Sequence, residues 1–309
     1  VSKDDSSLIL DKLRKEDPRI VVITKDNGGV ESARREGLRH VSGLYILHMD
    51  QDDMYDRNAI KRFVEVMEET EADVVVANNT RFFLNNHFTF GTCKTPAMTS
   101  AERVIEHEEF MQKYYRSFFG INDLPVNIWN KMYRRTFIES IPTPPITGHI
   151  IEDLSYNMHI LPYARKIAIL PDILYYYRWG GFTNRYDKTI LATALTGYRL
   201  KMQQIVQWQM PQFKHSTAVE LLNYLNTYFS QCVSYDVFNS EQFLEEARRL
   251  FSIEEVEEAS NIVKEYNKYH REYIDAMLDR DFVRLYNYEL LEKNRTKYKR
   301  ILKEFLLSL

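Results

Sequence analysis

The fold is decided by one stretch, Leu44-Tyr45-Ile46-Leu47-His48-Met49-Asp50-Gln51-Asp52-Asp53, in which an apolar run leads directly into an acidic turn. The run has the pattern of a buried strand. Three carboxylates on one turn repel one another, and burying them without a partner is costly. Mg²⁺ or Mn²⁺ removes that cost, since these hard cations bind one or two carboxylates together with substrate phosphates. The acidic turn at the end of a strand therefore suggests a metal–diphosphate site; the alternative, which is more frequent for such a turn taken alone, is a solvated loop that caps a helix starting near Asn58.

The segments around this stretch predict an α/β fold. Short apolar runs alternate with helical patterns, which is typical of a mixed, mostly parallel sheet whose ligands bind beyond the carboxyl ends of its strands. The predicted strands are Ile20–Ile23, Leu44–Met49, Asp73–Ala77 and Lys166–Leu170, with a further extended run at Ile173–Tyr177. The predicted helices are Ser6–Lys15, Val30–His40, Asn58–Thr70, Ser100–Phe119 and Glu152–Leu161, and Arg81–Pro96 is expected to form a hairpin or loop.

The chain changes character near Asp187. Beyond it nearly every segment has helical spacing, so we divide the chain into an α/β domain at 1–187 and an α-helical C-terminal domain at 188–309. The helices expected there are Ile190–Trp208, Ser216–Val233, Ser240–Leu250, Ile253–Leu278 and Asp281–Leu307.

Composition excludes several classes of protein. With 44% hydrophobic and 28% charged residues, the 309-residue chain has the apolar content to fold. A net charge of -3 offers no basic field for nucleic acid. Two cysteines provide neither a disulfide framework nor a cysteine zinc site, and a reducing, cytoplasmic compartment is the simpler interpretation. No apolar run approaches the roughly 20 residues of a membrane span.

A second motif, Asn27-Gly28-Gly29-Val30, follows the first predicted strand and opens a helix. Glycines permit close backbone approach, and a helix N-terminus favours anions. The motif has neither the Gly-Lys-Ser/Thr of a phosphate-binding loop nor the glycine spacing of a dinucleotide fingerprint. Taken alone, it is more often simply a turn and a cap.

Together, the motifs resemble the family 2 glycosyltransferases of the GT-A fold. The resemblance starts with Asn27-Gly28-Gly29, Ala33-Arg34-Arg35-Glu36-Gly37-Leu38 and Gly43–Asp53, where Arg35 and Gln51 are mild departures. Three later segments are similar to bacterial members that build surface polysaccharides. They are Ile128-Trp129-Asn130-Lys131-Met132-Tyr133-Arg134-Arg135, Ile150–Asn157, and Leu174–Arg178 followed by Phe182-Thr183-Asn184.

The resemblance implies an inverting, metal-dependent transfer of a sugar from a nucleotide-sugar, with a UDP-sugar as the expected donor and Mn²⁺ or Mg²⁺ as the cofactor. By position, Asp50 and Asp52 match the metal- and diphosphate-binding Asp-x-Asp, and Asp153 matches the general base, with Glu152 beside it near the acceptor. Residues that match positions at or near the donor are Asn27, Arg34, Lys131, Arg178 and Thr183.

Each assignment has a structural alternative. Glu152 and Asp153 open a predicted helix, where the dipole favours acids. Arg178 could pair with a surface carboxylate. Trp129 and the Tyr175–Tyr177 run are more often core than sugar platform, and His48 and His159 lack metal-ligand spacing and are expected to be structural.

The resemblance also implies a strand–helix–strand ahead of Val1 that this chain lacks, so we expect a longer natural protein. The expected acceptor is a glycan or a lipid-linked sugar in surface polysaccharide synthesis, with no nucleic acid as partner. The basic residues of 293–309 belong either to a packed helix or to one that contacts anionic lipid at the inner membrane face, and apolar helix faces allow a homo-oligomer. The alternatives are a non-catalytic scaffold subunit of the same fold and a phosphatase of the haloacid dehalogenase type, whose pattern Met54 breaks.

Overall fold

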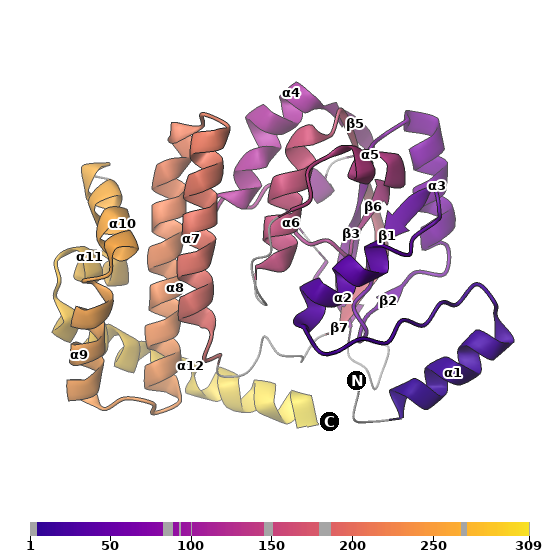
Figure 1. Cartoon of the computed structure of the whole chain (residues 1–309). Coiled ribbons are helices and arrows are strands. Elements are labelled where there is room, and N and C mark those ends of the chain that lie inside the picture. Colours follow the sequence, from indigo (N-terminus) through magenta and orange to yellow (C-terminus); the bar gives the residue numbers. More distant parts are fainter. Residues whose placement is uncertain are drawn as a thin grey trace.

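A mixed sheet forms the centre of this computed structural model, which describes residues 5–82, 89–92, 94–99, 101–144, 151–178, 187–266 and 271–308 (Figure 1). Within the described residues the sheet has seven strands in the order β1-β6-β3-β7-β2, with β4 on β3 and β5 on β7. Its strands are β1 (Tyr45–Leu47), β2 (Met54–Tyr55), β3 (Val74–Phe82), β4 (Thr89–Phe90), β5 (Arg103–Glu106), β6 (Lys131–Arg134) and β7 (Lys166–Arg178).

One long parallel pairing organises this sheet. β3 and β7 run side by side from Val74 opposite Ile167 to Phe82 opposite Arg178, and the other pairings in the described residues are antiparallel. The mixed sheet and the hairpin of β3 with β4 are therefore confirmed. The prediction that most strands of the sheet are parallel is wrong, because β1, β2, β4, β5 and β6 all pair in the antiparallel sense.

Alternation along the central strands builds two cores. Val74 and Val76 face one side and Val75 and Ala77 the other, as the two-residue period of a strand requires. The helix α3 (Ala59–Thr70) covers the second side with a buried stripe that includes Phe63 and Met67. The first side is covered by the π-helical turn Phe110–Tyr114, the 3₁₀ turn Tyr115–Phe118 and the helix α6 (Glu152–Ile160).

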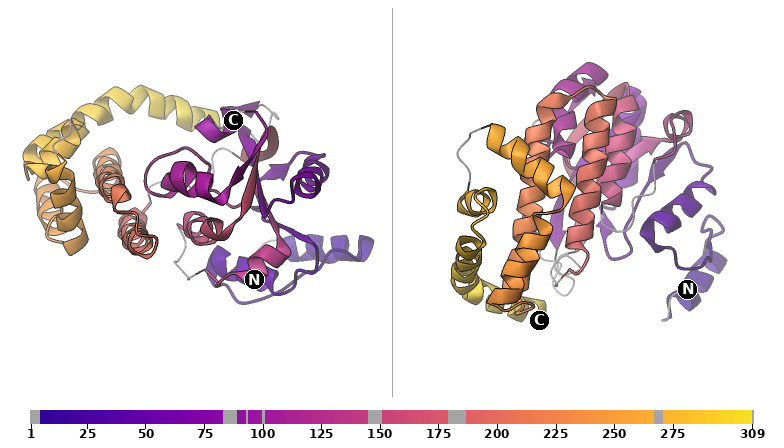
Figure 2. Two further views of the ribbon diagram at one scale, coloured as in Figure 1. Left: turned by 90° about the horizontal axis from the view of Figure 1, so that it is seen from above. Right: turned by 60° about the vertical axis from the view of Figure 1, so that its left-hand side comes forward.

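The C-terminal helices have a core of their own. It draws on α7 (Ile190–Gln207), α8 (Lys214–Ser234), α9 (Ser240–Leu250), α10 (Glu254–Glu265), α11 (Glu272–Leu278) and α12 (Phe282–Ser308). Figure 2 shows these helices stacked beside the helices that cover the sheet, and Ile205 of α7 joins the sheet-side core. The predicted helices are confirmed, except that 253–278 forms two helices instead of one. In the described part of the chain, no helix combines the length and apolarity needed to cross a membrane.

Three sequence predictions fail locally. Ile20–Ile23 has no regular secondary structure and makes no sheet pairing in the described residues, and Val21 is 70% exposed. Within the helix predicted at 100–119, Arg103–Glu106 is strand β5, paired with β7. The segments 166–170 and 173–177 form one strand, β7. The remaining elements are α1 (Ser6–Glu16), α2 (Gly29–Leu38), α4 (His107–Glu109), α5 (Arg135–Ser140) and the 3₁₀ turns Pro96–Thr99, Leu161–Tyr163 and Pro211–Phe213.

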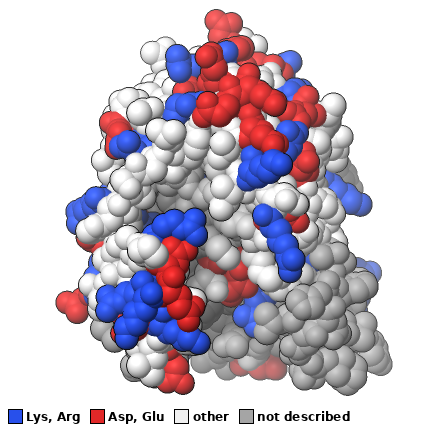
Figure 3. Space-filling model, turned by 90° about the vertical axis from the view of Figure 1, so that its right-hand side faces the viewer, with Lys and Arg blue, Asp and Glu red and all other residues white. Residues whose placement is uncertain are grey.

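Charge is mixed over the surface. On the face that Figure 3 shows, basic and acidic side chains are interspersed, and acidic ones gather at one end. This distribution agrees with the near balance of 41 basic and 44 acidic residues in the sequence.

Candidate functional site

The three carboxylates of the acidic turn after β1 lie in two different environments. Asp50 is partly buried and Asp52 exposed, and both line an open cleft of about 820 Å³. Asp53 is 5% exposed and points away from the cleft: it accepts hydrogen bonds from the Tyr175 hydroxyl at 2.6 Å and from the Arg178 amide at 2.8 Å. Burial raises the pKa of Asp53 to about 6, although those two hydrogen bonds oppose the shift. Asp53 thus fixes the turn to β7 and leaves Asp50 and Asp52 toward the cleft.

Tyr175 carries this support further. Its ring stacks on Trp129 with the centroids 4.3 Å apart, and its hydroxyl accepts a hydrogen bond from the Asp50 amide at 3.3 Å. Trp129 is 6% exposed, so both rings belong to the core, as expected. The Asp50–Asp53 turn is therefore held against the stacked rings of Tyr175 and Trp129 and is not an isolated solvent-exposed loop.

Arg34 joins the two predicted halves of the site. Its guanidinium donates to Asp153 Oδ1 at 2.6 Å and to Asp50 Oδ1 at 2.8 Å. The three side chains are 17%, 25% and 31% exposed for Arg34, Asp153 and Asp50 respectively. Burial alone would lower the pKa of Arg34, but the attraction of the two carboxylates outweighs it and raises that pKa above the ordinary value. Residues far apart in sequence are thus brought to one point, as a combined site requires.

The carboxylates respond to this environment. Burial raises the pKa of Asp50, and Asp153 and Asp52 add repulsion that Arg34 opposes. Burial also raises the pKa of Glu152 to about 7, again against the attraction of Arg34. Asp153 Oδ2 accepts a hydrogen bond from the Ile128 amide at 3.2 Å, so both oxygens of Asp153 have partners. Glu152 is therefore poised to exchange a proton near neutral pH, while Asp153 is fixed in orientation.

The N-terminus of α2 forms the opposite wall of the cleft. Gly29 has a φ of 82°, which favours glycine, and its amide donates to Asn27 Oδ1 at 3.1 Å. Lys25 lines the same wall, and its ammonium donates to Ser32 Oγ at 2.7 Å. Backbone amides at a helix start, with a lysine beside them, suit an anionic ligand. Lys25 is not among the residues predicted from the sequence, although it stands two residues after the apolar run Ile20–Ile23, next to the Asn27-Gly28-Gly29 motif.

The other predicted donor residues are placed less uniformly. Arg178 ends β7, and its amide is bound by Asp53. Lys131 is fully buried, and its ammonium donates to the carbonyls of Pro125, at 2.7 Å, and of Asn127. Lys131 thus holds the 125–130 loop, which carries the Ile128 amide to Asp153. Thr183 lies outside the described residues.

The cleft carboxylates fit a divalent cation that is also bound by substrate. No group of three or more His, Cys, Asp or Glu side chains among the described residues could hold a metal by itself. Two carboxylates on one turn line the same cleft as the backbone at the start of α2, and they match the one or two carboxylates that Mg²⁺ uses beside substrate phosphates. His48 is buried and is not among the residues that line the cleft, and burial and the charge of Arg34 lower its pKa to about 3, so its imidazole is neutral.

Known proteins match different shares of the chain. Residues 1–141 match the family model described as glycosyl transferase family 2. Glycosyltransferase GlyA of Streptococcus pneumoniae is 25% identical over 177 residues, which is 57% of this chain and 25% of GlyA. EpsJ of Bacillus subtilis, named an uncharacterized glycosyltransferase, is 27% identical over 176 residues, 57% of this chain and 49% of EpsJ. The chain thus spans a quarter to about half of these relatives.

A solved structure matches over nearly the whole chain. The crystal structure of TarS 1–349 from S. aureus in complex with UDP-GlcNAc aligns with a TM-score of 0.61 at 17% identity. The match covers 96% of this chain and 80% of that one, so the helical region is included. It shows a shared GT-A fold followed by helices.

Proposed function

Since residues 1–141 belong to glycosyl transferase family 2, we propose that this protein is an inverting, metal-dependent hexosyltransferase that moves a sugar from a nucleotide-sugar to a glycan or lipid-linked acceptor. The observation that carries the proposal is the double contact of Arg34 with Asp50 and Asp153. It supports the proposal because the two carboxylates that the resemblance matches to the donor side and to the base contact one side chain, beside a cleft large enough for a nucleotide-sugar.

The roles follow from the chemistry of the residues. Inversion needs a base on the face of the sugar opposite the leaving group, and Asp153, held by Arg34 and the Ile128 amide, would take the proton of the acceptor hydroxyl. Arg34 and Arg178 would bind diphosphate oxygens, which guanidinium groups suit. Asn27 would contact the nucleotide at the start of α2, and Thr183 the donor.

Lys131 would act on the site indirectly, through the loop that it holds. A divalent cation, bound by Asp50 and Asp52 with the donor, would neutralise the charge that develops on the departing diphosphate. Glu152 would bind an acceptor hydroxyl, and its raised pKa allows it to donate as well as accept near neutral pH.

Uridine diphosphate sugars are the proposed donor class. The sequence resemblance supports it, and so do the structures of TarS 1–349 in complex with UDP-GlcNAc and with UDP. We further propose that the acceptor belongs to bacterial surface polysaccharide synthesis, that the protein works peripherally at the inner face of the membrane, and that 188–309 is a helical domain that supports the acceptor side or a homo-oligomer.

Calorimetric titration tests the donor site. UDP and several UDP-sugars are titrated with Mn²⁺, with Mg²⁺ and with EDTA into the wild-type chain and into Asp52→Ala. Asp279→Ala serves as the matched control, since Asp279 is an exposed carboxylate of the helical region. We expect metal-dependent binding that Asp52→Ala abolishes and the control retains.

A second variant separates binding from chemistry. Asp153→Asn should keep UDP binding but lose sugar transfer, or the slow hydrolysis of the UDP-sugar that stands in for it. Failure of the wild-type chain to bind any UDP-sugar would refute the donor site and favour the alternative of a non-catalytic scaffold subunit.

A further inference from the structure

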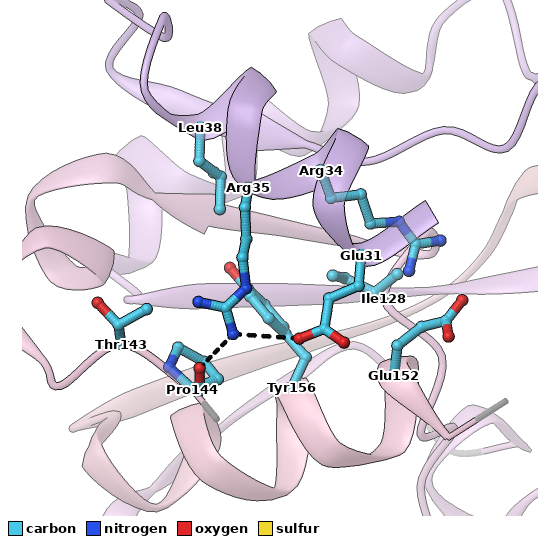
Figure 4. Close-up of a pocket in the computed structure, with 9 residues that line it drawn as sticks. All are labelled: Glu31, Arg34, Arg35, Leu38, Ile128, Thr143, Pro144, Glu152 and Tyr156. Atoms are coloured by element: carbon cyan, nitrogen blue, oxygen red, sulfur yellow. Dashed lines mark hydrogen bonds and ion pairs between the residues drawn. The ribbon is translucent and has the colours of Figure 1, made fainter. Parts of the chain in front are cut away.

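A second, smaller pocket lies beside the donor cleft, between α2 and α6. It has a volume of about 50 Å³ and shares Arg34 and Glu152 with the cleft (Figure 4). Arg35 and Leu38 of α2 form one wall and Tyr156 of α6 another. Figure 4 shows Pro144 at the end opposite Glu152. The pocket therefore adjoins the cleft through Arg34, which contacts Asp153, and through Glu152, the neighbour of Asp153 in sequence.

Polar atoms of this pocket are left without partners. Arg35 Nε, Tyr156 Oη and Glu152 Oε2 are buried and accept or donate no hydrogen bond. The same guanidinium is held in place at its other end, where Nη2 donates to Glu31 and to the Pro144 carbonyl (Figure 4). Buried polar groups usually have partners, so a donor held rigidly with its Nε–H unpaired indicates a ligand atom.

The volume and the lining residues of the pocket restrict the kinds of ligand that it can bind. One water needs about 10–15 Å³, so the pocket admits a substituent of a few atoms and not a sugar ring. Carbon atoms of Leu38, Ile128 and Pro144 supply apolar surface, which favours a methyl group. The carboxylates of Glu31 and Glu152 balance the charges of Arg34 and Arg35, so the pocket favours neither an anionic nor a cationic substituent. A neutral group with a methyl, a carbonyl acceptor and an N–H fits each of these features.

We infer that this pocket binds the acetamido group of an amino sugar. Its methyl would lie against Leu38 and Pro144, and its carbonyl would accept from Arg35 Nε–H or the Tyr156 hydroxyl. The inference rests on the proposed function and adds a substrate class to it. The acetamido group belongs either to the donor sugar or to the acceptor sugar, because the pocket adjoins both the donor cleft and Asp153.

The test compares acetamido sugars with their hydroxyl counterparts in two arms. In the donor arm, UDP-GlcNAc and UDP-glucose are titrated with Mn²⁺ by calorimetry. In the acceptor arm, the methyl glycosides of N-acetylglucosamine and glucose are compared by saturation-transfer NMR in the presence of Mg²⁺, which is diamagnetic, and UDP. We expect the acetamido sugar to bind about tenfold more tightly in one arm, which identifies the source of the group.

Filling the pocket should remove that preference. Thr143 is exposed at the pocket edge, so Thr143→Phe tests the pocket with little risk to folding, and Leu38→Phe fills it from the other side. Thr227→Phe, at an exposed threonine of α8 away from both pockets, is the matched control. Both pocket variants should bind UDP as the wild type does but show no acetamido preference.

Two results would overturn the inference while leaving the proposed function intact: equal binding of the acetamido and hydroxyl sugars in both arms, or a preference that survives both Phe substitutions. Loss of UDP binding by the wild-type chain would instead refute the proposed function, and this inference with it.

Discussion

Replacing Arg34 by methionine removes the guanidinium that links Asp50 to Asp153 and keeps a side chain of comparable reach. Hydrogen bonds to charged groups contribute about 1.5–3 kcal/mol each, and exposed ion pairs less than about 1 kcal/mol. Because Arg34 is 17% exposed and its partners are a quarter to a third exposed, the lower part of that range applies. We therefore expect Arg34→Met to lower the free energy of unfolding by about 2–3 kcal/mol.

Arg34→Lys is the matched comparison. Lysine retains the charge, but a single ammonium lacks the planar fork that reaches two carboxylates at once. About half of the loss should therefore be recovered.

Urea unfolding of the wild type, Arg34→Met, Asp153→Asn and the double variant measures the coupling. Residues in direct contact show coupling energies of about 0.5–3 kcal/mol, and we expect about 1 kcal/mol or more for this pair. Additive losses, or an Arg34→Met variant within about 0.5 kcal/mol of the wild type, would refute the link between the two halves of the site.

Four further outcomes are expected. Asp53→Ala removes both hydrogen bonds that fix the acidic turn and should cost about 3 kcal/mol in urea unfolding, with Asp53→Asn costing less because its oxygen still accepts from the Arg178 amide. Glu289 is 2% exposed, and burial raises its pKa from 4.5 to about 7. The free energy of unfolding of the wild type should therefore fall by about 3 kcal/mol as the pH rises from 4.5 through 7, because the buried carboxyl must lose its proton. Glu289→Gln should gain that amount relative to the wild type over the same interval, and a pH-independent difference between the two would contradict the argument. If Glu152 donates a proton in transfer, Glu152→Gln should remove an inflection near pH 7 from the rate profile, because the pKa of Glu152 is raised to about 7. A Cβ at Gly197 of α7 would meet Ile151 at an ordinary contact distance of 3.8 Å, so Gly197→Ala should raise the melting temperature slightly. Gly197→Phe should instead displace Ile151, which directly precedes Glu152, and should reduce sugar transfer more than UDP binding.

The features that could be read from sequence are those set by local pattern. An apolar run leading into acidic residues predicts a strand end wherever its neighbours lie, and β1 with the Asp50–Asp53 turn confirms it. The helix that opens at Glu152 follows in the same way. The sequence also separated the sheet region from the helices that begin at Ile190.

The sequence predictions that failed concern features that depend on contacts with residues far along the chain. Ile20–Ile23 has a strand composition, but a strand also needs a neighbour to bond its backbone, and none pairs with it in the described residues. The sequence predicts a helix at Arg103–Glu106, because four residues carry too little period to identify a strand. The pairing of this segment with β7 makes it a strand. Likewise, the residues alone could not show that Asp53 turns toward Tyr175, away from Asp50 and Asp52.

The two walls of the cleft differ in how firmly they are held, and this difference bears on how a donor would bind. α6, on the Asp153 side, packs into the sheet-side core through Met158 and Ile160. By contrast, α1 and α2 contain no buried residue, and Leu8 and Ile9 of α1 are more than half exposed. Arg34 and Arg35 tether α2 to the rest of the site, through hydrogen bonds to Asp50, Asp153 and the Pro144 carbonyl. Low local stability of this kind allows a segment to open and close. A donor that contacts the α2 side should therefore stabilise α2 as it binds. As the donor concentration is raised, protection from hydrogen exchange should increase at the α2 amides before it increases at the α6 amides.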